Sequence, residues 1–137
     1  MENQTTDSKK ITAIEAVKDQ IARYLSRADK RIATLAAEMN KDYLRFFEWY
    51  AEDMFEEQTR RKFYANLADE IKEWGGEDLS KDLLKMAQRK VNEIARGSLT
   101  RNSTSQMANT AHLLNLQAQQ TLIEEIEGLA YLAAHAE

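Results

Sequence analysis

Residues 32–54 read IATLAAEMNKDYLRFFEWYAEDM, and this stretch decides the class of fold. Its apolar residues recur at steps of three and four: Ile32, Leu35, Met39, Tyr43, Phe46, Tyr50 and Met54. This spacing places them along one side of an α-helix, close to the heptad repeat by which helices pack together. The stretch therefore predicts an all-α protein, and we interpret the stripe as a packing face.

The residues before this stretch predict another helix. An apolar stripe runs through Ile11, Ile14, Val17, Ile21 and Leu25. Asp7 or Ser8 could cap its start, and Asp29 could cap the helix that carries the longer stripe. We therefore expect residues 1–8 to form a flexible tail and residues 9–137 to form one helical domain.

The residues after the stretch predict two or three more helices. Residues 56–62, EEQTRRK, have no apolar side chain, so we expect the chain to break or bend there. Gly75 and Gly76 form the clearest stop signal. A helix should then start near Asp78 or Ser80 and end at Gly97, and a last helix should run from about Gln106 to Ala134.

Composition supports one compact helical domain. The 137 residues include no proline and only four glycines, and chains of this length form a single core. The near-heptad stripe, sustained for about three heptads, suits an antiparallel bundle or a short coiled coil. The fold prediction is an all-α, single-domain antiparallel helical bundle of four or five helices.

The expected location is the cytoplasm, with no membrane attachment. The chain has no cysteine, which fits a reducing compartment. The first ten residues, MENQTTDSKK, are polar and do not resemble a secretory signal. Residues 102–123 are uncharged but rich in amide and hydroxyl side chains, which makes insertion into a bilayer implausible.

The sequence gives little support to catalysis, so we predict a protein that is not an enzyme, with no catalytic residue, no cofactor and no metal. The two histidines, His112 and His135, lack metal-ligand spacing. Two pairs of acids at helical spacing support an alternative reading as a metal-dependent all-α nucleotide hydrolase. These pairs are Asp53 with Glu56 and Glu70 with Glu73, and facing helices could join them around Mg²⁺.

A basic stripe supports a second alternative, a nucleic-acid-binding accessory protein. Lys81, Lys85 and Arg89 follow one another at every fourth residue and could track phosphates. The net charge of −4 argues against this reading, because nucleic-acid-binding domains are usually basic. The stripe could equally pair with the acid-rich residues 48–57 or face solvent.

The favoured reading is a homo-oligomeric interaction or adaptor module. Nine of the eleven aromatic residues lie between Tyr43 and Trp74, which is more than one packing stripe needs. Trp49 and Trp74 fall toward helix flanks, and such side chains are enriched at protein interfaces. We therefore predict Trp49, Arg45 and Trp74 as partner-binding residues, and a second copy or another protein as the partner.

Overall fold

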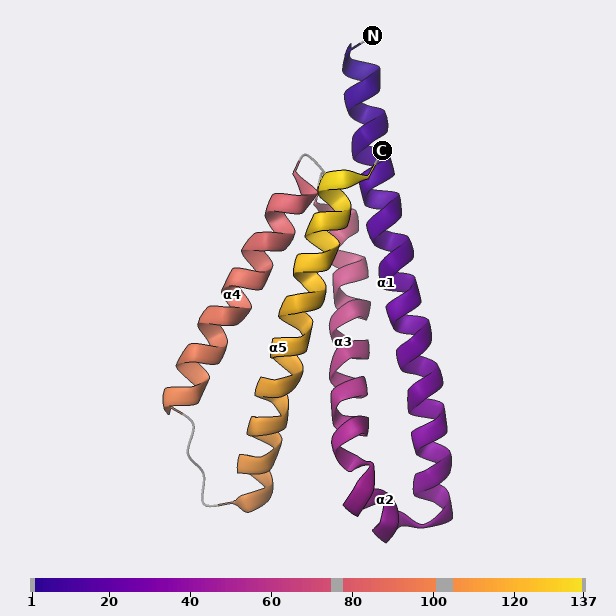
Figure 1. Ribbon diagram of the computed structural model, residues 1–137, viewed down its shortest axis with the longest axis vertical. Helices are drawn as coiled ribbons and strands as arrows, with labels where there is room; N and C mark the ends of the chain where they lie inside the picture. Colours follow the sequence, from indigo (N-terminus) through magenta and orange to yellow (C-terminus); the bar gives the residue numbers. More distant parts are fainter. Residues whose placement is uncertain (1, 75–77, 101–104, 137) are drawn as a thin grey trace.

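The computed structural model describes residues 2–74, 78–100 and 105–136, and it describes side chains in these ranges except for residues 2–11 and 97–100. These ranges hold five helices and no strand: α1 (Glu2–Lys41), α2 (Tyr43–Trp49), α3 (Ala51–Glu73), α4 (Leu79–Thr100) and α5 (Gln106–His135). Figure 1 shows α1, α3, α4 and α5 running alternately down and up, with the short α2 at one end. The prediction of an antiparallel all-α bundle is confirmed.

The first helix is much longer than the sequence pattern predicts. α1 begins at Glu2 and continues for 40 residues, so the expected helix start at Asp29 is wrong. Asp29 is exposed in mid-helix, and its carboxylate accepts a 2.5 Å hydrogen bond from Nε of Arg61 in α3. A residue that can cap a helix serves here in an ion pair between two helices. The flexibility expected of residues 1–8 stays a prediction.

The chain bends at Asp42 and Tyr50, and not within residues 56–62 as expected. Asp42 has an extended backbone, and its side chain accepts a hydrogen bond from the backbone N–H of Arg45 at 3.1 Å, which caps α2. Tyr50 has φ of −128° and ψ of −6°, which bends the chain between α2 and α3. α3 then runs without interruption through residues 56–62.

Capping residues mark the starts of the last two helices. Asp78 accepts a hydrogen bond from the backbone N–H of Lys81 at 3.1 Å, and Ser105 accepts one from that of Ala108 at 3.2 Å. Both starts agree with the predictions. The predicted stop at Gly75 and Gly76 lies outside the described residues, between the end of α3 and the start of α4. The expected stop at Gly97 is wrong, because α4 continues to Thr100.

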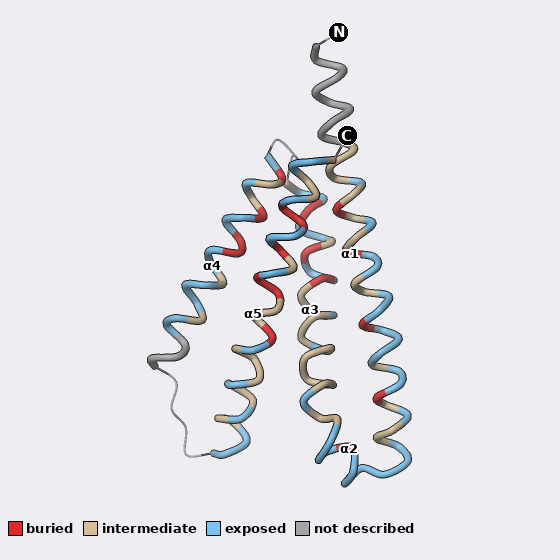
Figure 2. The backbone as a smooth tube through the Cα atoms, in the orientation of Figure 1, coloured by how far each residue is buried: buried red, intermediate tan, exposed pale blue. Residues whose placement is uncertain are grey.

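The main core occupies the half of the bundle in which α5 ends. Buried side chains from α1, α3, α4 and α5 meet there. Figure 2 shows the backbone segments of buried residues, in red, more frequent toward that end. The buried residues include Val17, Ile21, Tyr64, Leu67, Ile71, Leu79, Leu83, Leu122, Ile126 and Leu129. Toward α2, burial is sparse and is provided by Ala28, Leu35 and Phe46. The bundle is therefore tightly packed at one end and open at the other.

The stripe that decides the fold is only partly a packing face. Leu35 and Phe46 are buried, whereas Ile32, Met39, Tyr50 and Met54 are half-buried. Tyr43, which the stripe placed in the core, is exposed. The bend at Asp42 explains the difference, because the helical phase of α1 does not continue into α2.

Candidate functional site

Exposed apolar side chains gather at the end of the bundle where α2 lies. Phe46 is buried and holds α2 against the bundle. Leu44 and Trp49 remain 80% and 68% exposed, and Tyr43 and Phe47 are exposed as well. A helix of seven residues, capped by Asp42 and bent away at Tyr50, can bury only one of its sides. The other side therefore presents aromatic and aliphatic groups to solvent.

The aromatic rings of α2 contact each other on two sides of the helix. The Tyr43 and Phe47 rings lie 6.3 Å apart between centroids, on the exposed side. The Phe46 and Tyr50 rings lie 6.5 Å apart. Both distances lie within the range at which neighbouring aromatic rings attract each other.

Further apolar side chains are exposed on α3 and near the start of α5. A hollow of about 420 Å³ lies along the start of α3, and Ala51, Met54 and Phe55 supply its apolar lining. Met107 and Leu113, near the start of α5, are both 59% exposed. Of the nine large hydrophobic side chains exposed in the described ranges, six belong to α2 or the start of α5, so the exposed apolar area is concentrated at this end. We call α2, the hollow on α3, Met107 and Leu113 the end surface.

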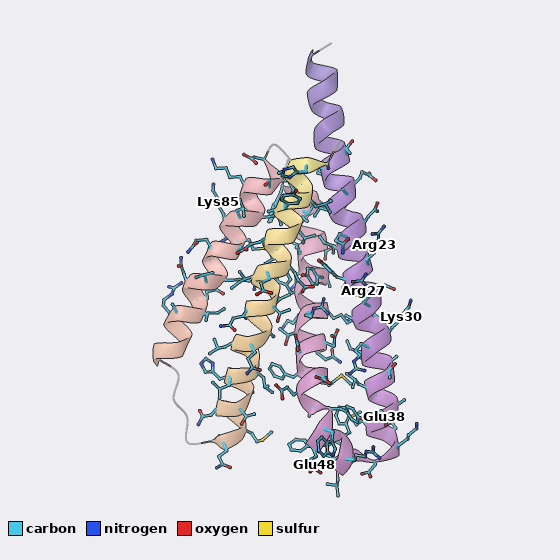
Figure 3. The ribbon with its side chains drawn as sticks, viewed as in Figure 1. Arg23, Arg27, Lys30, Glu38, Glu48 and Lys85 are labelled. Atoms are coloured by element: carbon cyan, nitrogen blue, oxygen red, sulfur yellow. The ribbon has the colours of Figure 1, made fainter. Side chains whose placement is uncertain are left out.

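The end surface also carries charges of both signs. Arg45 and Glu48 are exposed on α2, and neither forms an ion pair with another described residue. Figure 3 shows Glu48 at this tip and Glu38 above it on α1. Glu38 pairs with Lys41 at 3.7 Å, and Asp53 pairs with Arg31 at 3.3 Å. The available charges on α2 are thus one cation and one anion, one helical turn apart.

The three residues predicted to bind a partner do not lie together. Trp49 and Arg45 both belong to the end surface and are exposed. Trp74 follows the last residue of α3 and packs against the main core, half-buried. The 23 residues of α3 separate the two tryptophans by roughly 35 Å. Trp74 and Trp49 therefore lie beyond opposite ends of α3.

The predicted basic stripe forms a solvent-exposed side of α4. Lys81, Lys85 and Arg89 are all exposed, and none pairs with residues 48–57 in the described structure. In Figure 3, Lys85 points outward from α4, on the side of the molecule away from Arg23, Arg27 and Lys30 of α1. The cations on α1 and α4 therefore do not form one continuous basic surface.

A groove of about 250 Å³ separates α3 from α4 beside this stripe. Its lining includes two acids, Glu70 and Glu93, as well as Arg89 and Lys90. The ammonium group of Lys90 lies 4.5 Å from the centre of the Phe63 ring and donates a 2.5 Å hydrogen bond to Gln119. Burial lowers the pKa of Lys90, although Glu93 and Glu70 act in the opposite direction. The mixed charges give the groove no preference for phosphate.

Sequence reasoning missed a group of charged side chains between α3 and α5. The guanidinium of Arg60 donates two hydrogen bonds to the Glu125 carboxylate, from Nε at 3.1 Å and from Nη2 at 2.6 Å. It also lies 3.4 Å from Glu57, and all three side chains are less than one-fifth exposed. Residues 57, 60, 64, 67 and 71 form one stripe at steps of three and four. Opposite charges at such inward positions were the signal available in the sequence.

The surroundings of this group shift several pKa values. Burial raises the pKa of Glu57, and the nearby Arg60 only partly counteracts this. Burial also raises the pKa of the Tyr64 phenol well above its usual range, and the negative charge of Glu125 adds to the shift. The Tyr64 hydroxyl is fully buried and makes no hydrogen bond of ordinary geometry within the described structure. The Arg60 group is therefore a largely buried network of two acids around one cation, and its charges are engaged with one another.

The two acid pairs expected to share a metal lie on the same helix. Asp53, Glu56, Glu70 and Glu73 all belong to α3, and the two pairs are about 25 Å apart along it. The expectation that facing helices join them is wrong, because α3 does not break between them. Among the described side chains, no group of three or more His, Cys, Asp or Glu residues could hold a metal ion.

Comparison with known proteins gives no match to a protein-family model, to a curated protein or to a solved structure. Within the described ranges, no helix is both long and apolar enough to cross a membrane.

Proposed function

We propose that this protein is a non-enzymatic helical module that acts through protein–protein contacts and assembles with itself. The observation that supports this proposal is the end surface. It gathers Tyr43, Leu44, Phe47 and Trp49 on one short helix, exposed and next to an apolar hollow. Tryptophan, tyrosine and arginine dominate the binding energy of protein interfaces, and α2 offers all three.

Exposed apolar side chains favour association because their contact with water costs free energy. Burying apolar surface is worth about 25 cal/mol per Å², so covering several aromatic side chains contributes several kcal/mol to association. Contiguous apolar patches on soluble proteins commonly mark contact sites. The sparse burial in the same half of the bundle leaves room for a partner to complete the packing.

We also propose that the protein works in the cytoplasm. The absence of cysteine from the sequence supports a reducing compartment, in which disulfides would give no advantage. Nucleic-acid binding by Lys81, Lys85 and Arg89 is the alternative function. We favour it less, because Glu70 and Glu93 line the groove beside Arg89 and would repel phosphates.

The test replaces Leu44 and Trp49 with serine and measures mass by analytical ultracentrifugation. We expect the unchanged protein to self-associate at micromolar to submillimolar concentrations and the L44S/W49S variant to be monomeric. The matched control is L84S/V91S, which also removes two exposed apolar side chains, but from α4. Self-association should persist in this control. A wild-type protein that stays monomeric throughout would contradict the proposal.

A further inference from the structure

On the exposed side of α2, the order of apolar and charged residues is the same when it is read from either end. Leu44, Arg45, Glu48 and Trp49 occupy one side of the helix, at about 100° per residue, and the buried Phe46 lies away from it. Read in either direction, an apolar residue is followed by a charged one, and the two charges have opposite signs. In the described structure, neither Arg45 nor Glu48 is engaged in another ion pair.

The midpoint of these four residues along α2 lies between positions 46 and 47. A two-fold axis perpendicular to the helix at this level would bring the four residues of one copy into reciprocal pairs with those of the other. If two α2 helices lie antiparallel about this axis, Arg45 of each copy faces Glu48 of the other. Leu44 of each copy then faces Trp49 of the other. Contacts across a two-fold axis occur twice, so one favourable charge pair becomes two. The order of residues on α2 is therefore complementary to a second copy of this chain.

We propose that α2 is the self-association element and packs antiparallel against α2 of a second copy. Two Arg45–Glu48 ion pairs form at the centre of this contact, and Leu44 of each copy packs against Trp49 of the other on either side. This inference rests on the proposed function, because it specifies the partner and geometry of the end surface. Other occupants use the charges less well. Nucleic acid would be repelled by Glu48, and an anionic lipid surface would be repelled by Glu48 and by the exposed Glu52 nearby.

The size of the contact requires more than α2. A helix of seven residues is about 10 Å long, whereas a stable interface buries about 800 Å² on each partner. The hollow on α3 and Met107 of α5 belong to the same end of the bundle and can enlarge the contact. In this arrangement the α2 pair forms the centre of the interface, where charge complementarity determines orientation and specificity.

The experiment reverses one charge at a time and then mixes the variants. R45E gives α2 two carboxylates, and E48R gives it two cations. We expect each variant alone to dimerise with a Kd at least about tenfold weaker than the wild type, because both reciprocal pairs become repulsive. An equimolar mixture of R45E and E48R should form a heterodimer, since every facing pair is again of opposite sign. The double variant R45E/E48R should regain the wild-type Kd for self-association.

Sedimentation velocity gives the masses, and labelling one variant with a fluorophore identifies the heterodimer. The control is R23E, which makes the same charge change on the outer side of α1, away from α2. It should dimerise like the wild type, and circular dichroism should show equal helicity for all variants. If the wild type associates and the single reversals leave its Kd unchanged, or their mixture forms no heterodimer, the α2 pairing is overturned and the proposed function stands. A monomeric wild type overturns both.

Discussion

Arg60 links α3 to α5 through an ion pair with Glu125. Its guanidinium faces the Glu125 carboxylate with two donors, a geometry that lysine could not reproduce. Two acids share this one cation, because Glu57 lies 3.4 Å away on the next turn of α3. The two acids have different roles. Glu125 forms the close pair between helices, whereas Glu57 is desolvated and only weakly bound.

The first prediction concerns the pH dependence of stability and compares Glu57→Gln with Glu125→Gln. The pKa of Glu57 is raised above its unfolded value of 4.5, so the folded protein binds its proton more tightly than the unfolded chain. Stability contributed by this group is present at low pH and is lost as pH rises from 4.5 through the raised pKa. Glutamine does not titrate, so the stability of E57Q should fall less over that interval. Urea unfolding at a series of pH values measures it.

The same measurement separates the two acids near neutral pH. E57Q should unfold within about 0.5 kcal/mol of the wild type, because a weak contact is lost and a desolvated charge is removed. E125Q should lose about 2 kcal/mol, because the bidentate pair disappears and Arg60 stays partly buried. Equal losses in the two variants would contradict the division of roles between these acids.

At the scale of elements, α2 depends on the residue before it. The Asp42 carboxylate accepts the backbone N–H of Arg45 at 3.1 Å, while the buried Phe46 supplies the main tertiary contact of α2. A helix of two turns has few internal hydrogen bonds, so a single cap is a large part of its stability. The orientation of the end surface thus rests on Asp42 and Phe46.

The second prediction concerns replacement of the capping residue Asp42. Asp42→Ala should destabilise the protein by about 1 kcal/mol, because the N–H of Arg45 loses its acceptor. For a chain of this length, that is a fall in Tm of about 4 °C by calorimetry. Asp42→Asn is the matched control, because its side-chain oxygen can accept the same hydrogen bond, and it should stay within about 1 °C of the wild type. A control that fell as far as the alanine variant would show that the charge, and not the cap, is what matters.

The elements also show how far the sequence predicts this fold. The helical periodicity correctly predicted the class and the start of α5 near Gln106, and the start of α4 lies near Asp78 as expected. The prediction of a helix start at Asp29 was wrong because aspartate can form either a cap or an ion pair. Which of the two it forms depends on the position of Arg61 in the folded protein. The continuity of residues 56–62 was missed because charged residues face inward there. The position of Arg60 beside Glu125 depends on the packing of α3 against α5, and these two residues lie 65 positions apart in the chain.

The proposed contact site could be predicted from the sequence only in part. Trp49 falls off the apolar stripe, and it is exposed. Leu44, Met107 and Leu113 carry no such signal. Their exposure depends on the bend at Asp42 and on which part of α5 the other helices cover. Trp74 packs half-buried against the main core, and its role in partner binding stays a prediction.

At the scale of the whole molecule, packing is uneven from one end to the other. Along α5, the buried residues run from Ala118 to Ala130, while residues 106–117 are half-buried or exposed. The start of this helix therefore buries less side-chain surface than its second half. Helices without buried contacts open more readily.

The third prediction concerns amide hydrogen exchange along α5. Amides of residues 110–117 should exchange at least about tenfold faster than those of residues 119–130, because opening the first part exposes little apolar surface. Mass spectrometry of peptides from each part measures the rates at a concentration where the protein is monomeric. Protection of residues 110–117 that rises with protein concentration would indicate that self-association covers them. Uniform slow exchange in the monomer would contradict the uneven packing.

The ion pair between Arg60 and Glu125 also restricts how α5 can align with α3. Ala118, Leu122, Ile126 and Ala130 recur at every fourth position of α5, so their apolar seam would look nearly the same after a slide of one turn. Such a slide would move Glu125 by about 6 Å and bring Thr121 or Leu129 beside Arg60. Arg60, largely removed from water, would then lose its bidentate partner and keep only the weaker contact with Glu57, at a cost of about 2 kcal/mol. The apolar side chains of α5 hold the bundle together, and one pair of charges selects a single register among those that they would tolerate.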